Sequence, residues 1–482
     1  MTIRTLPDDA LIEIFSIYVE GEYQTYDGEF GIKRLEVWYA LVHVCQRWRN
    51  LIFASPRRLN LRLVCTSTTP VKKILDIWPT FPIVLHEWIL DSNAQLSIKN
   101  ADNIIAALQH RDRLYQICLG FDSIPIFYAC TTMMQESFHA LSHLYLLSRI
   151  EPAHVLPDSF LGGFAPSLRT LVLSGITFPA LPKLLLSSID LVDVRLWDVP
   201  HSGYISPEAM VTCLSSLTCL EKFCLAFRSP QSHPGRSSRR PSSLTRVDLP
   251  VLTHFRLEGV NEYIEDFVAR INTPLLHGIT ISFFNQLLFD TSQLNGFIGR
   301  VELFNTLHQA EVCFQGQRAY ITLSSSENTD DFPTIVIYIT CTQSEWQLSS
   351  LAEICSTSQS LWALRLFSLE RLYILVEYAP PGHWHDDMEN IQWQELLQSF
   401  TAVKDLYLSE ELALRVAQAL QDHVGDSEKE TELFPALQNI FVQGRQLLVA
   451  VQKTIRPFIA TRQVSGNPVA IYHWKRWYWE ID

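Results

Sequence analysis

The sequence lacks the patterns that are typical of zinc sites, membrane spans and well-known catalytic sites. Its ten cysteines are scattered, and no C-x-x-C pair occurs among them, so the ligand spacing of a structural zinc site is missing. There is no run of eighteen apolar residues, which predicts that the chain does not span a membrane. Nucleophile elbow, phosphate-binding glycine loop, H-E-x-x-H and kinase signatures are also missing, and this lowers the expectation of catalysis without excluding it.

Positive charge is scarce as well. The 38 Lys and Arg residues stand against 51 Asp and Glu residues, which makes a formal charge of −13. That balance argues against a broad surface for nucleic acid or for anionic membranes. Scattered cysteines in a long chain are typical of buried thiols in a reducing compartment, and the first seven residues are too short and polar for a signal peptide. We therefore expect a cytoplasmic or nuclear protein.

The composition, with 47% hydrophobic and 18% charged residues, is typical of a folded protein. A chain of 482 residues is too long for one compact core unless it is a repeat array. We expect an α/β protein in which a small helical module precedes such an array. The expected divisions are a helical module over 1–63, a connecting segment with a first repeat-like unit over 64–110, a solenoid over 111–445 with a mobile loop near 228–246, and a C-terminal cap over 446–482.

Two amphipathic stretches define the N-terminal module. In the first, Leu11, Ile14, Phe15 and Tyr18 are spaced i, i+3, i+4 and i+7, which predicts that they share one helical face. The acidic residues just before them suit the start of a helix, where negative charge is favoured. The second apolar stripe also has helical spacing and consists of Leu41, Val44, Cys45, Trp48 and Ile52.

These two stretches resemble an F-box. The resemblance rests on the L-P-x-[DE] start at 6–9, the I-F pair at 14–15 and the V-C-x-R-W-R run at 44–49. The segment 102–114 is similar to sequences that follow the F-box in the expanded F-box families of basidiomycete fungi. The stretch 23–36 is longer than the usual link between the two helices, which puts the geometry of their join in question.

The resemblance implies docking onto a Skp-type adaptor and, through it, onto the cullin of a ubiquitin ligase. It places six residues at or near the adaptor contact: Leu6, Pro7, Leu11, Ile14, Val44 and Trp48. The alternative is that these helices only cap the array that follows, since repeat arrays need capped ends.

One short pattern, apolar-x-x-apolar-x-apolar, recurs through the rest of the chain. Its first eight occurrences begin 22 to 32 residues apart, close to the period of leucine-rich repeats. The alternative is a plain α/β layer fold whose strands happen to read this way. We expect further strands at 319–323 and 334–340 and a helix at 346–355, with larger units there. The occurrences begin at Leu114, Leu141, Leu168, Leu191, Leu220, Leu252, Leu276, Ile298, Leu361, Val403 and Leu437.

Two polar segments are candidates for chemistry. The run R-R-P-S at 239–242 resembles a basophilic kinase site and makes Ser242 a candidate phosphorylation site. The alternative, which is favoured, is an exposed linker loop without such a role. His383, His385, Asp386 and Asp387 have side chains that can ligate a divalent metal. They are local and have no partner ligands in view, so we expect a solvated turn, no metal and no cofactor.

The sequence thus predicts a non-catalytic substrate-recognition subunit of an SCF-type ubiquitin ligase, which binds an adaptor through its first helices and a target protein through its repeats. The alternatives are a repeat scaffold without ligase linkage and, more weakly, an enzyme with an unrecognised site. The sequence does not name the target.

Overall fold

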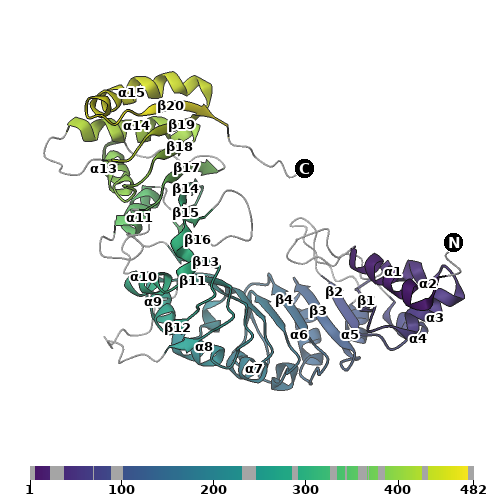
Figure 1. Cartoon of the computed structure of the whole chain (residues 1–482). Coiled ribbons are helices and arrows are strands. Elements are labelled where there is room, and N and C mark those ends of the chain that lie inside the picture. The colour runs from purple at the N-terminus through teal and green to yellow at the C-terminus, as the bar shows by residue number, and fades with distance from the viewer. Residues whose placement is uncertain are drawn as a thin grey trace. The chain divides into compact units, whose positions relative to one another are not determined.

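The protein is a mixed α/β protein with a long, mostly parallel sheet of sixteen strands. Figure 1 shows helices and strands alternating along the chain after an N-terminal group of helices. The chain divides into two compact units, Met1–Tyr204 and Ile205–Asp482. The computed structural model describes residues 6–21, 37–68, 70–87, 101–230, 246–284, 291–325, 334–341, 345–356, 366, 368–377, 386–425 and 433–475. Within those ranges, no helix combines the length and the apolar character needed to cross a membrane.

The first unit contains three helices and then six strands of the long sheet, in the order β1-β2-β3-β4-β6-β8. All neighbours in this order pair in parallel. Parallel neighbours need a returning segment between them, and helices supply most of these returns. The bounds are α1 Asp8–Gly21, α2 Val37–Val42, α3 Gln46–Ala54, β1 Leu63–Cys65, α4 Val71–Ile77, β2 Ile83–Glu87, α5 Ala101–Leu108, β3 Leu114–Phe121, α6 Ile124–Met133, β4 His143–Ser148, β6 Thr170–Ser174, α7 Leu181–Ser187 and β8 Asp193–Val199.

The second unit holds ten strands of the sheet, in the order β9-β11-β13-β16-β15-β14-β17-β18-β19-β20. Strand β15 is antiparallel to both of its neighbours, so β16 returns beside β13 and β14 lies beside β17. The bounds are α8 Pro207–Leu214, β9 Lys222–Phe227, β11 His254–Gly259, α9 Asn261–Ala269, β13 Gly278–Phe284, α10 Ser292–Gly299, β14 Gln309–Gln315, β15 Arg318–Ser324, β16 Thr334–Thr340, α11 Glu345–Ser356, β17 Arg371–Glu377, α13 Asp386–Leu397, β18 Asp405–Leu408, α14 Glu410–Gly425, β19 Asn439–Gln443, α15 Arg445–Val464 and β20 Ala470–Trp474.

Helices of the second unit pack on one face of its strands. Phe267 of α9 stacks 5.8 Å from both Phe223 and Phe255, and the ring of Trp393 in α13 lies 5.8 Å from Phe314. Each such buried apolar side chain contributes roughly 1.5–3 kcal/mol, and stacking of neighbouring units makes the core continuous. The alternate strand residues form the opposite face, which we call the open face. In β14 it carries Gln309, Glu311, Cys313 and Gln315.

Nine of the eleven predicted repeat motifs lie on strands, and these predictions are confirmed. The motif Ile298/Val301/Leu303 is a wrong prediction, because it falls on the end of α10 and on a 3-10 turn at Glu302–Thr306. The reason is that the same spacing also turns apolar side chains inward at a helix end: Ile298 and Val301 are each 1% exposed. The motif that begins at Leu361 falls mostly outside the described residues.

The interval 304–360 is only partly as predicted. The strands expected at 319–323 and 334–340 are confirmed as β15 and β16, and the helix at 346–355 as α11. The repeat array was expected to continue here with larger units. Instead, β15 pairs in antiparallel fashion with both β14 and β16, so the parallel order of the strands is interrupted. Strand β14 was missed. Its alternating Ala310, Val312 and Phe314 were a usable period-two signal.

The range 446–482, predicted to be a C-terminal cap, contains most of helix α15 and strand β20. Strand β20 pairs in parallel with β19, from Asn439 opposite Ala470 to Gln443 opposite Trp474. It follows the long helix α15, so this end of the sheet is one more helix–strand unit. Residues 476–482 lie outside the described residues.

Two histidines on strands of the first unit, His86 on β2 and His143 on β4, are held in their neutral form. The Nδ1 atoms of His86 and His143 are buried and have no hydrogen-bond partner among the described residues. Burial lowers the pKa of His86 to about 4. Burial also lowers the pKa of His143 to about 4, and the nearby Arg62 and Arg169 act in the same direction.

These pKa values predict that acid destabilises the protein. Between pH 6.5 and 4 the unfolded chain binds protons at both histidines and the folded chain does not, so the free energy of unfolding falls as the pH falls through this window. Above pH 6.5 both histidines are neutral in the folded and in the unfolded chain, so the free energy of unfolding no longer depends on their protonation. We expect a loss on the order of 1 kcal/mol per imidazole at pH 5, allowing for partial exposure. Chemical unfolding of the whole chain at pH 7.5 and 5.0 measures it. A His86→Gln/His143→Gln chain with the wild-type pH dependence would contradict the assignment.

Candidate functional site

Helix α1 has apolar side chains on two different arcs of its surface. At about 100° per residue, Leu11, Ile12, Phe15 and Val19 share one arc, and all four are at most 6% exposed. The other arc holds Ile14, Ile17 and Tyr18, which are 44%, 68% and 45% exposed. The predicted shared helical face of Leu11, Ile14, Phe15 and Tyr18 is confirmed by helix α1, because about 100° per residue keeps all four on one side of the helix. This face lies at the edge of the core, so Leu11 and Phe15 are buried while Ile14 and Tyr18 are exposed. Exposed apolar side chains that lie together are typical of protein-binding surfaces.

The second predicted stripe is broken into two helices. Helix α2 ends at Val42 and α3 begins at Gln46, with Cys45 as an extended N-cap residue. Val44 lies in the break and is 58% exposed. The guanidinium of Arg49 holds the break, because its Nε donates a hydrogen bond to the backbone oxygen of Val42 at 3.0 Å.

Arg47 joins the two ends of the module. Its Nε donates to Asp8 Oδ1 at 3.0 Å and its Nη2 donates to the backbone oxygen of Leu6 at 2.6 Å. Nearby, the ring of Trp48 packs 4.7 Å from the ring of Phe15 at an interplanar angle of 60°. The start of α1 and the start of α3 thus meet. The long connection 23–36 itself lies outside the described residues.

The structure places the six predicted contact residues in three environments. Pro7, Ile14 and Val44 are exposed, while Leu6 and Trp48 are half-buried. Leu11 is 0% exposed in the chain by itself, so it lies beneath the exposed residues, and its place at or near an adaptor contact stays a prediction. Two exposed apolar residues of the same arc, Ile17 and Tyr18, were not among the predicted contacts. We use the name N-terminal apolar surface for the exposed apolar residues of this module, which are Pro7, Ile14, Ile17, Tyr18 and Val44.

The contact of Arg47 with Asp8 predicts a small effect on stability. The two side chains are 38% and 58% exposed, and such pairs are worth less than about 1 kcal/mol. We expect Arg47→Ala to lower the free energy of unfolding by about that amount, and Arg47→Lys to recover only part of it, because a single ammonium cannot reproduce the guanidinium fork. Thermal unfolding of the two variants measures this. A loss above about 3 kcal/mol would mean that Arg47 supports more than this contact.

The core beneath the N-terminal apolar surface is continuous with the first strands. The same cluster of buried residues contains Trp38 of α2, Leu63 of β1 and Phe81 just before β2. The Trp38 ring lies 5.5 Å from the Phe81 ring, and its Nε1 donates to the backbone oxygen of Arg62 at 3.1 Å. The helices are thus anchored to the sheet of the same unit.

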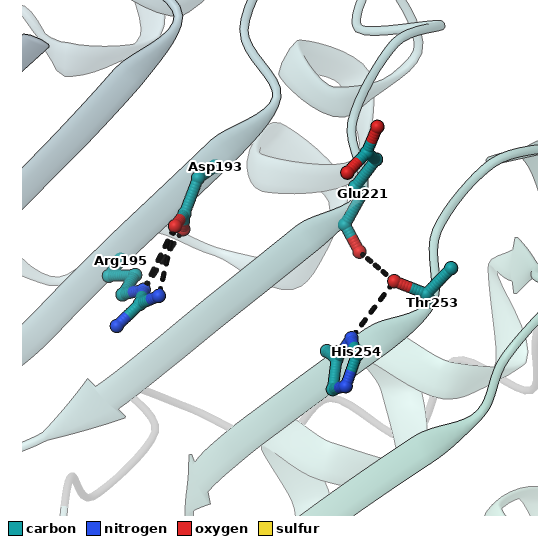
Figure 2. Close-up of polar contacts among 5 residues, drawn as sticks. All are labelled: Asp193, Arg195, Glu221, Thr253 and His254. Carbon is teal, nitrogen blue, oxygen red and sulfur yellow. Dashed lines mark hydrogen bonds and ion pairs between the residues drawn. The ribbon is translucent and has the colours of Figure 1, made fainter. Parts of the chain in front are cut away.

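Figure 2 shows two groups of polar contacts, one at Asp193 and Arg195 and one at Glu221, Thr253 and His254. Asp193 and Arg195, both on β8, form an ion pair with oxygen–nitrogen distances of 3.0–3.2 Å. Thr253 Oγ1 donates to the backbone oxygen of Glu221 at 3.0 Å and lies 2.9 Å from His254 Nδ1. The acceptor of the Thr253 hydroxyl is the Glu221 carbonyl and not its carboxylate, so this contact does not supply the acid of a Ser-His-Asp triad.

The remaining predicted sites lie mostly outside the described residues, although Asp386 and Asp387 begin helix α13. Ser242 and the pair His383 and His385 fall in ranges whose structure is not described, and the predicted mobile loop does so for the most part. A different group of metal-type ligands was not foreseen: Glu311 and Cys313 of β14 and Glu377 of β17 bring one ligand atom each to within 4.8 Å of one another. Burial raises the pKa of the adjoining Tyr320 phenol, and Cys313, Glu311 and Glu377 raise it further.

Comparison with known proteins leaves the chain without an assigned family: no family model and no curated protein matches it.

Proposed function

We propose that this chain is the substrate-recognition subunit of an SCF-type ubiquitin ligase. Its N-terminal helices would bind a Skp-type adaptor, and its sheet would be an irregular leucine-rich-repeat solenoid that binds a target protein. In this role the protein does no bond chemistry. It holds the target beside the ligase and so raises the effective concentration of the target there.

The observation that carries the proposal is the N-terminal apolar surface. Ile14 and Val44 belong to the F-box-like motifs, and they are 44% and 58% exposed, although apolar residues of a small module would normally be buried in its core. The motif residue Arg47 contacts Leu6 and Asp8 of the other motif, so the two sequence motifs form one structural unit. A surface of this kind favours docking of a partner over a purely capping role.

Co-purification tests the proposal. The whole chain is expressed together with a Skp-type adaptor, and a stable one-to-one complex is expected on size-exclusion chromatography. Leu6→Ala/Pro7→Ala and Trp48→Ala chains are expected to give less complex. No complex with the wild-type chain would overturn the proposal, whereas binding unchanged by the substitutions would overturn the assignment of these residues.

The second candidate is a repeat scaffold that has no connection to a ligase. The continuity of the module core with Leu63 and Phe81 favours it, because this is how a terminal cap covers the end of an array. The two candidates differ in what they expect of Ile14 and Val44. A cap needs only the buried residues, so substitution of these exposed residues would leave all its interactions unchanged.

A further inference from the structure

A row of aromatic rings runs across four neighbouring strands on the open face of the second unit. Tyr373, Tyr407, Phe441 and Tyr472 are register partners on β17, β18, β19 and β20. The ring centroids of Tyr373 and Tyr407, and of Tyr407 and Phe441, are 4.4 Å apart, with interplanar angles of 13° and 7°. Tyr472 continues the row at 5.4 Å and is 49% exposed.

Trp474 of β20 stands across this row. Its ring makes angles of 81° with Tyr407 and 67° with Tyr373, at centroid distances of 5.4 and 6.2 Å. Its Nε1 donates to the backbone oxygen of Leu408 at 3.3 Å, which fixes the indole in this position. Tyr373 and Trp474 therefore form two aromatic walls at a steep angle to each other, and both are half-buried rather than covered.

Two carboxylates lie on the side of Tyr373 that faces β14 and at the end of its own strand. Glu311 of β14 is the register partner of Tyr373, and Glu377 lies on the same face at the end of β17. Their oxygens belong to the group that lies within 4.8 Å together with the Cys313 thiol. Tyr320 donates to Glu311 at 3.2 Å, and Gln315 donates to Glu377. Two carboxylates this close favour a cation between them.

The charge of this part of the open face is negative. On β14, on β15 and on β17 to β20 its charged residues are Arg318 and Arg371 against Glu311, Glu377 and Asp405, so the sum is 2 − 3 = −1. Carboxylates together with aromatic walls recognise an organic cation, through charge-assisted hydrogen bonds and through contact with the rings. A metal ion would use oxygen, nitrogen or sulfur ligands on its other sides and gain little from Tyr373 and Trp474.

We propose that this cluster of Glu311, Glu377, Tyr373 and Trp474 binds an arginine side chain presented by a protein target. Arginine fits because its planar guanidinium can meet two carboxylates and stack on an aromatic ring at once. The inference rests on the proposed function in one respect, namely that the partner is the protein delivered to the ligase. The binding itself needs no adaptor.

Fluorescence anisotropy with the whole chain and no adaptor tests the proposal. The probe is a labelled peptide made of three Gly-Leu-Arg-Ser repeats, and the matched peptide has Gln in place of each Arg. We expect saturable binding of the first peptide only, weakened about tenfold or more by E311Q/E377Q, in line with the loss of roughly one charged contact. E395Q removes one carboxylate charge, as each single substitution E311Q or E377Q does, but from an exposed position on helix α13, and it should leave the affinity within about twofold. Thermal unfolding of each variant shows that it is folded.

Several results would overturn the proposal: equal binding of the Gln peptide, equal weakening by E395Q, or no binding of the Arg peptide. Stoichiometric Zn²⁺ binding by EDTA-treated protein that is lost in E311Q and that blocks the peptide would assign the cluster to a metal instead. The two proposals fail separately. Adaptor binding without peptide binding overturns only this inference, and peptide binding without adaptor binding supports it while overturning the ligase assignment.

Discussion

A chain that carries Ile14→Asp is expected to bind a Skp-type adaptor about 100-fold more weakly than the wild type and to unfold at an unchanged temperature. Ile14 is 44% exposed in the chain by itself, so the substitution removes little from the core. Contact with an adaptor would bury this side chain, which is worth roughly 1.5–3 kcal/mol, and burial of a carboxylate in its place adds a further cost. About 2.7 kcal/mol corresponds to a 100-fold change in affinity.

The matched control is Ile391→Asp on helix α13 of the second unit. Ile391 is 57% exposed, so the control makes the same chemical change on a comparably exposed side chain. Titration calorimetry of both variants against the adaptor measures the effect. If Ile14→Asp binds as the wild type does, the N-terminal apolar surface is not the docking site. If both variants lose affinity equally, the effect is one of net charge.

The largest effect on stability is expected from Trp38→Ala. Trp38 is 1% exposed, and its ring lies 5.4 Å from Trp78 and 5.5 Å from Phe81. Truncation leaves a large cavity and removes the indole hydrogen bond to the backbone oxygen of Arg62, so we expect a loss of about 3–5 kcal/mol. Trp38→Phe keeps a ring in the core and should lose roughly half as much.

Denaturant unfolding of the whole chain, together with limited proteolysis, measures this prediction. Cleavage is expected to begin in the N-terminal helices of Trp38→Ala, because their core depends on this ring. The variant should also lose the adaptor, in this case through unfolding, which distinguishes it from Ile14→Asp. An unchanged unfolding midpoint in Trp38→Ala would contradict the central place of Trp38 in the core.

Local pattern was enough to predict most of the elements. The strands predicted at 334–340 and 319–323 and the helix predicted at 346–355 are confirmed to within one residue at each end. Their signals lie within one element: alternate apolar side chains mark a strand, and apolar side chains three and four apart mark a helix. The motif at Ile298 shows the limit of such signals, since a spacing of three and then two fits a helix end as well as a strand.

The candidate sites could not be predicted from local pattern, because they depend on contacts between elements that are distant in the sequence. In α1 the sequence offers two apolar arcs, and only packing against α2, α3 and β1 decides that Leu11 is buried and Ile14 exposed. The cluster of Glu311 and Glu377 joins residues 66 positions apart in the sequence, through the pairing of β14 with β17.

The sequence by itself determined that this protein has an N-terminal helical module and a long series of strands and helices, because side-chain periodicity is a local property of the chain. Only the tertiary structure decided the strand order β13-β16-β15-β14-β17, the contact of Arg47 with Asp8 and the aromatic row beside Glu311. The physical reason is that strand pairing is set by backbone hydrogen bonds between distant segments. These bonds are available to nearly every residue and leave no mark in local sequence.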